Sequence, residues 1–256
     1  MRILVTNDDG ITAEGIERLA RMARELGEVT VVAPDSQCSA MSQKLSILTD
    51  IRARRAEFPV EGVTAYTVSG TPADCVRMAV DMLLPERPDI VFSGINNGYN
   101  TGYDIAYSGT VGACMEALIA GIPAIAFSTD FRGVFGATDA YLGDVTRQVL
   151  ERPIAHNEIW NLNFPGVEAD ECRGILWDRV IAQDDFYNNK YEFAGQEPDG
   201  TMCYHIVPDR ISEALPGTDI AAVTDGYVSI GKIRCSVISD DPAERVTYRG
   251  RRIKKA

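Results

Sequence analysis

The 256-residue chain has little histidine and no long apolar run, and both shortages narrow the classes of protein to consider. Its two histidines, His156 and His205, stand outside the polar loops described below, so we expect structural roles for both. No apolar segment approaches the roughly 18 residues that a membrane-spanning helix needs. The first residues lack the apolar core of a signal peptide. We therefore expect a cytoplasmic protein without a membrane partner.

Paired cysteines and clustered positive charge are also missing. The six cysteines are spread along the chain without a C-x-x-C pair, which favours reduced thiols. The 25 basic residues are outnumbered by 37 acidic ones, for a net charge of -12. Because binding to nucleic-acid polymers depends on clustered Lys and Arg, no such partner is expected. Residues 245–256 are an exception, with six basic residues and no acidic one. This tail is either solvated or docked on an acidic neighbouring subunit.

Four common catalytic fingerprints are absent. The sequence has no G-x-x-x-x-G-K-[ST] loop for phosphates and no G-x-G-x-x-G after its first apolar run. No cysteine is followed six positions later by arginine, and no G-x-S-x-G elbow is present. These absences exclude the usual nucleotide-binding loops, the cysteine-phosphatase loop and the hydrolase serine.

Apolar runs alternate with helical patterns through the first half of the chain. Strands are predicted at 2–6, 28–33, 88–92 and 122–127, and helices at 16–26, 71–84, 110–120 and 137–151. Strands that alternate with helices predict parallel β-α-β units. The fold class we expect is therefore α/β, with a Rossmann-like, doubly wound, mostly parallel sheet.

Beyond residue 151 the alternation breaks down. Strands are predicted at 159–164, 174–182 and 202–207 without helices between them. Residues 184–200 are polar with interspersed aromatics, which indicates a projecting arm or a long loop. Because no linker is visible, we expect a single domain over 1–256. It would comprise a Rossmann-like core at 1–165 and C-terminal β-hairpin or arm extensions at 166–256.

The loop after the first strand carries two adjacent carboxylates, Asp8 and Asp9. In open α/β sheets, ligands bind outside the carboxyl ends of the strands, which is where this loop lies. Like charges so close together disfavour one another unless a cation lies between them. The alternative is a plain polar turn, because Asp-Gly is a common turn pair. Oxygen ligands would favour magnesium, manganese or calcium over zinc.

Two further loops carry polar groups. Residues 35–43 include Ser39 among several hydroxyls, although this loop alone resembles an ordinary surface loop. Residues 93–112 are rich in glycine and asparagine, so their backbone can approach a ligand closely. Within them, Ser108 opens a helix, and unpaired N–H groups at a helix start bind phosphate. The alternative for Ser108 is a plain helix cap.

Several motifs together resemble the SurE family of survival-protein 5'/3'-nucleotidases. They are TNDDG at 6–10, VVAPD at 31–35 followed by Ser39, SGTPADCV at 69–76, PDIVFSGIN at 88–96, YSGTVGA at 107–113, NLNFP at 161–165 and GTDIAAVTDGYVSI at 217–230. The resemblance implies a metal-dependent phosphatase acting on nucleoside monophosphates. It also implies a homodimer or homotetramer built by exchanged C-terminal arms.

Carried over by position, the resemblance implies the residues of the site. The metal ligands would be Asp8, Asp9, Ser39 and Asn96. The substrate would contact Asn96, Asn97, Ser108, Gly109 and Thr110.

The expected reaction is hydrolysis of a phosphate monoester by water, with the metal as Lewis acid. Asp8 or Asp9 would be the general base, and a covalent aspartyl-phosphate is the alternative to direct attack by water. Backbone N–H groups at Gly109 and Thr110 would hold the transferring group. We expect 5'-nucleotides as substrates, with 3'-nucleotides and short polyphosphates as further candidates. The competing hypothesis is a non-catalytic nucleotide-binding or stress-sensing protein on the same fold.

Overall fold

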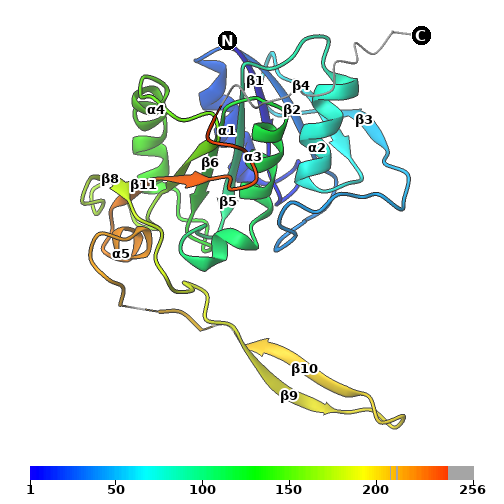
Figure 1. Ribbon diagram of the computed structural model, residues 1–256, viewed down its shortest axis with the longest axis vertical. Helices are drawn as coiled ribbons and strands as arrows, with labels where there is room; N and C mark the ends of the chain where they lie inside the picture. Colours follow the sequence, from blue (N-terminus) through cyan, green and yellow to red (C-terminus); the bar gives the residue numbers. More distant parts are fainter. Residues whose placement is uncertain (208, 212, 242–256) are drawn as a thin grey trace.

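A central sheet of nine strands carries helices on both faces, and a separate two-stranded hairpin projects from it (Figure 1). The computed structural model describes residues 1–207, 209–211 and 213–241. The basic segment 245–256 lies outside the described residues. No helix in the described part of the chain is long and apolar enough to cross a membrane.

The strands are β1 Arg2–Thr6, β2 Glu28–Pro34, β3 Ala53–Ala56, β4 Thr64–Val68, β5 Ile90–Asn97, β6 Ala124–Thr129, β7 Glu158–Asn163, β8 Ile175–Arg179, β9 Lys190–Gln196, β10 Met202–Val207 and β11 Val228–Arg234. The α-helices are α1 Glu14–Arg24, α2 Pro72–Met78, α3 Gly109–Ile119, α4 Gly136–Leu150 and α5 Asp219–Thr224. A π-helical turn, Ala79–Leu83, continues α2, and a 3-10 turn covers Tyr103–Ala106.

The order of strands in the sheet is β3-β4-β2-β1-β5-β6-β7-β11-β8. All neighbours from β4 to β7 are parallel, which confirms the predicted doubly wound sheet. From β1 the chain builds outward through β2 on one side and later through β5 on the other. The point where the strand order reverses therefore lies between β1 and β5, where such sheets bind their ligands.

Alternation along β1 divides the core into two layers. Ile3 and Val5 pack with apolar residues of α1 and α4 on one face of the sheet. Leu4 packs with residues of α2 and α3 on the other face. Helix α3 is built from small residues and is buried along most of its length, as its composition predicted.

The second half of the chain differs from the prediction in two respects. Strands β8 and β11 extend the main sheet, so residues beyond 165 contribute to the core as well as to an arm. The short helix α5 lies between β10 and β11, where no helix was expected. Its six residues are too few to show a periodic pattern, and it begins where the Thr218 side chain accepts a hydrogen bond from the Ala221 N–H.

The polar segment 184–200 contains β9, which pairs with β10 in an antiparallel hairpin. The hairpin extends away from the sheet (Figure 1), in agreement with the predicted projecting arm. All six cysteines are free, as their spacing suggested.

Candidate functional site

Predicted site residues from three loops meet in one pocket of about 460 Å³. It lies at the carboxyl ends of the parallel strands, beside the point where the strand order reverses. Among the predicted residues, its lining includes Asp8, Ser39, Asn96, Asn97 and Ser108. Loops that are far apart in sequence are thus brought together as the doubly wound topology predicts.

Asp8 is buried at the end of β1 and lies against the first turn of α3. The Thr110 hydroxyl donates to Asp8 Oδ1 over 2.6 Å, and the Thr110 backbone N–H also bonds the carboxylate. Burial raises the pKa of Asp8 to about 6, although the Thr110 hydroxyl lowers it and the charge of Asp9 raises it further. A cation at this carboxylate would therefore relieve an electrostatic penalty.

Asp9 is half-buried and connects β1 with the end of β5. Its Oδ2 accepts the Asn97 backbone N–H over 3.0 Å. Burial raises the pKa of Asp9, while hydrogen bonds from the Asn97 backbone and the Gln37 side chain lower it. Because Asn97 adjoins Asn96, this bond keeps Asp9 close to Asn96, the predicted metal ligand at the end of β5.

The loop that carries Ser39 is fixed to the same structures. The Cys38 N–H donates to the Asp8 carbonyl over 2.7 Å. Four residues after Cys38, the Ser42 N–H donates to the Tyr107 carbonyl over 2.9 Å. Ser39 is itself exposed and lines the pocket. The loop that looked like an ordinary surface loop in the sequence is therefore bonded to the chain on both sides of Ser39.

Asn96 is oriented by its own loop. Its side-chain Nδ2 donates to the Gly98 carbonyl over 2.8 Å. Because the nitrogen is engaged in this bond, the amide oxygen is the atom that Asn96 offers to a cation.

The start of α3 shows the plain helix cap that the sequence left open as one alternative, and phosphate binding there stays a prediction. Ser108 is a helix cap, since its hydroxyl accepts the Val111 N–H over 3.0 Å. Thr110 directs both its hydroxyl and its backbone N–H to Asp8. A Cβ added at Gly109 would lie 2.9 Å from Asp8 Cβ and Oδ2, so only glycine permits this approach. The Asp8 carboxylate thus lies at the positive end of the α3 dipole.

The donor set fits a hard divalent cation. It consists of two carboxylates, the Ser39 hydroxyl and the Asn96 amide oxygen, which are the ligand types that magnesium, manganese and calcium prefer. Among the described residues, no Lys, Arg or His forms an ion pair with Asp8 or Asp9. No group of three or more His, Cys, Asp or Glu suited to a metal occurs in that part of the chain, so a zinc-type cluster is not found there.

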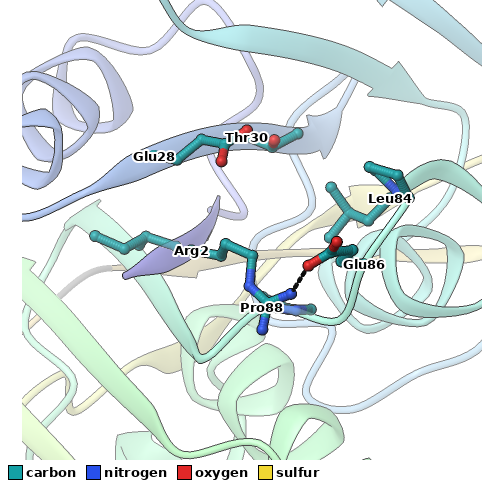
Figure 2. Close-up of a pocket in the computed structure, with 8 residues that line it drawn as sticks. Arg2, Glu28, Thr30, Leu84, Glu86 and Pro88 are labelled. Atoms are coloured by element: carbon teal, nitrogen blue, oxygen red, sulfur yellow. Dashed lines mark hydrogen bonds and ion pairs between the residues drawn. The ribbon is translucent and has the colours of Figure 1, made fainter.

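A second pocket, of about 200 Å³, lies at the amino ends of β1 and β2 (Figure 2). Arg2 and Glu28, the first residues of β1 and β2, line it together with Glu86. Arg2 forms ion pairs with Glu86 and Asp89, so its charge is already balanced. None of the predicted site residues lines this pocket.

Sequence reasoning missed the aromatic part of the larger pocket. Tyr107, Phe131, Tyr187 and Arg210 also line it. Phe131 follows β6, so the rule that ligands bind at carboxyl strand ends could have identified it. Tyr187 and Arg210 lie at the base of the hairpin, and no local pattern places them there.

Comparison with known proteins finds relatives that match most of the chain. The model of the family described as "Survival protein SurE" matches residues 3–185. The 5'/3'-nucleotidase SurE of Shigella dysenteriae is 38% identical over 96% of this chain and 95% of its own length. The 5'-nucleotidase SurE of Aeromonas hydrophila is 38% identical over 90% of both chains.

A solved structure gives the same result. The crystal structure of the SurE protein from Aquifex aeolicus superposes with a TM-score of 0.78 at 34% identity, and the match covers 93% of this chain and 95% of that one. The chain belongs to the SurE family.

Proposed function

We propose that the protein is a 5'-nucleotidase, a phosphoric monoester hydrolase that converts nucleoside monophosphates to nucleoside and phosphate. Its relatives from Shigella and Aeromonas carry nucleotidase names and match nearly the whole chain. The observation that carries the proposal is that Asp8, Ser39 and Asn96 line one pocket beside the N-terminus of α3. Asp9 is outside the lining but accepts the backbone N–H of Asn97, the residue next to Asn96. A non-catalytic nucleotide-binding protein has no need of these paired carboxylates.

Asp8, Asp9, Ser39 and Asn96 would hold a magnesium or manganese ion, with calcium as a substitute in crystals. When bound, the cation supplies Lewis acidity that polarises a phosphoryl oxygen. Asp8 or Asp9 accepts a proton from the attacking water. Asn97 and the first turn of α3, at Ser108 and Gly109, position the phosphate, because helix N-termini attract anions. Thr110, whose hydroxyl and backbone N–H are bonded to Asp8, supports this turn by holding the carboxylate in place.

The Shigella relative is named for activity on both 5'- and 3'-nucleotides, and we expect this chain to cleave both kinds of nucleotide. Cleavage of short polyphosphates stays a prediction. So does a cytoplasmic location.

We also propose that the protein forms a homodimer or homotetramer through exchanged C-terminal arms. Five large apolar side chains of the hairpin are at least half exposed: Tyr191, Phe193, Met202, Tyr204 and Ile206. Apolar surface of this extent on a projecting element is typical of a contact with another chain.

Phosphate release from AMP and GMP tests the activity. The full chain is treated with a chelator and then assayed with added magnesium, manganese or neither. We expect release only with a cation, and a loss of at least a thousandfold in Asp8→Asn and in Asp9→Asn. Asp35→Asn, which changes an exposed carboxylate at the end of β2, is the control and should keep its activity. Metal-independent release, or full activity in both site variants, would disprove the assignment.

A further inference from the structure

The outer part of the large pocket offers aromatic faces that the reaction at phosphorus does not use. Tyr107 and Phe131 line it, and their side chains are 62% and 42% exposed. A ring that only filled the core would be buried, as Phe92 of β5 and Phe127 of β6 are. Exposed rings beside a polar site leave π faces free for a ligand.

Arg210 lies on one of these rings. Its guanidinium carbon is 3.4 Å from the centre of the Phe131 ring, which is the distance of a stacked pair. Its backbone is held at the base of the hairpin by a β-bridge to Tyr187 and by a hydrogen bond from its N–H to the Asp209 side chain. Phe131 and Arg210 therefore form a flat two-layer surface that joins the end of β6 to the hairpin base.

The charge of the pocket makes Arg210 unusual. Among the described lining residues it is the one Lys, Arg or His, and the other charged residues are Asp8 and Asp104. A guanidinium that stacks on a ring keeps an outer face, which is planar and weakly hydrated and can stack on a further ring. An ammonium group at the same position would offer no such plane.

We infer that the Phe131–Arg210 pair is the platform on which the base of the nucleotide stacks, while the phosphate is held at the other end of the same pocket. This inference rests on the proposed function and adds the residues that bind the base. A pocket of about 460 Å³ has the size of typical small-ligand sites. Stacking accepts every base, and its strength increases with the area of the ring, so purine monophosphates are favoured over pyrimidine ones.

The test compares two esters that share a phosphate and a ribose but differ in the base. AMP and ribose 5-phosphate are assayed with the metal-loaded full chain, with Phe131→Ala, Phe131→Leu, Arg210→Ala and Arg210→Lys. Phe131→Leu keeps apolar bulk without a π face, and Arg210→Lys keeps charge without a plane. Met82→Ala is the control, since Met82 is also an exposed apolar residue but lies on the π-helical turn after α2, outside this pocket.

Stacking on a base is worth about 1–3 kcal/mol on alanine substitution, which corresponds to about a 5- to 150-fold change. We expect the ratio of kcat/KM for AMP to that for ribose 5-phosphate to fall about tenfold in all four variants, through KM, and to stay constant in Met82→Ala. An equal loss on both esters would mean that the pair acts on the phosphate or on the fold, and would overturn the inference. An unchanged ratio would overturn it as well.

A binding measurement separates this inference from the proposed activity. Adenosine and ribose are titrated calorimetrically into the metal-free chain, where no hydrolysis is involved. We expect adenosine to bind the parent about tenfold more tightly than it binds Phe131→Ala, and ribose to show no difference. If the parent hydrolyses neither ester, the proposed function fails, and the adenosine titration alone decides whether the platform exists.

Discussion

The hydroxyl of Thr110 donates to Asp8 Oδ1 over 2.6 Å, and this contact joins the first turn of α3 to the loop after β1. The two residues are 102 positions apart in sequence, and both are almost fully buried. The bond favours the charged form of a carboxylate whose pKa is raised by burial. Thr110 is thus a positioning residue for Asp8.

Replacing Thr110 with valine keeps the shape of the side chain and removes the hydroxyl. Hydrogen bonds to charged groups contribute about 1.5–3 kcal/mol, so we expect a loss of about tenfold or more in kcat/KM on AMP. Loss of the bond raises the pKa of Asp8, so the acidic limb of the pH–rate profile should move to higher pH. Thr110→Ser keeps the hydroxyl and should restore the parent profile. A Thr110→Val profile that superposes on the parent's would contradict the role given to this contact.

Gly109→Ala tests how closely α3 must approach Asp8. The new Cβ would lie 2.9 Å from Asp8 Cβ and 3.2 Å from the Cys38 carbonyl, and neither neighbour can move freely. A displacement of about 1 Å at a reacting group can lower the rate about a hundredfold, so we expect a loss of that order in kcat.

Gly143→Ala is the matched control for this substitution. Within 4 Å its Cβ would meet only the far end of the flexible Arg147 side chain, and the position lies inside α4. It should keep its activity and gain about 0.5–1 kcal/mol in free energy of unfolding. Thermal melts and phosphate release would check both variants. Equal activity in Gly109→Ala and Gly143→Ala would mean that the approach of α3 to Asp8 does not matter.

The site could be predicted from the sequence where a general rule of topology applies. Asp8 and Asn96 meet because β1 and β5 are parallel neighbours, and their carboxyl ends must share an edge. The base of the hairpin could not be placed in this way. Arg210 follows the hairpin strands β9 and β10, and it reaches Phe131 only because the chain folds back after them. No local sequence pattern predicts that path.

The same distinction holds for the sheet. The segment 64–68, TAYTV, has the composition of a strand, and β4 could have been recognised from it. By contrast, β11 lies between β7 and β8, antiparallel to one and parallel to the other. Its β-branched residues, Val228, Ile230 and Ile233, favour a strand but do not show which strands it pairs with, because pairing is decided by the whole sheet.

The metal-free protein should become less stable as the pH rises from about 4 to above 6. Burial raises the pKa of Asp8 from 3.8 to about 6 in the folded state. In this window the folded protein keeps a proton that the unfolded chain has released, so the free energy of unfolding falls with rising pH. The shift corresponds to a contribution of up to about 3 kcal/mol from Asp8.

Asp8→Asn removes this contribution. With a chelator present, urea unfolding should show the variant more stable than the parent at pH 7 and similar to it at pH 4. Asp35→Asn, at an exposed position, should differ from the parent by less than about 0.5 kcal/mol at both pH values. If Asp8→Asn is less stable than the parent at pH 7, the buried carboxylate does not destabilise the metal-free fold.

The last prediction concerns the hairpin, which has one apolar face and one polar face. Tyr191 pairs with Ile206, and Phe193 pairs with Tyr204, so these four side chains share one face of the ribbon. Glu192 pairs with His205 on the opposite face. An isolated two-stranded hairpin is marginally stable in water, so its apolar face should be covered by a second copy of the chain.

We therefore expect at least a dimer by light scattering at micromolar concentration. Phe193→Ser combined with Tyr204→Ser should weaken the assembly about a hundredfold or more, because it removes two large apolar contacts of roughly 1.5–3 kcal/mol each. Glu192→Gln, on the polar face of the same strand, should leave the mass unchanged. A monomeric parent, or a double variant that keeps the parent's mass, would show that the hairpin does not join the subunits. Since the base of the hairpin also carries Arg210, a dimer that orders the hairpin would hold the outer wall of the pocket in place as well.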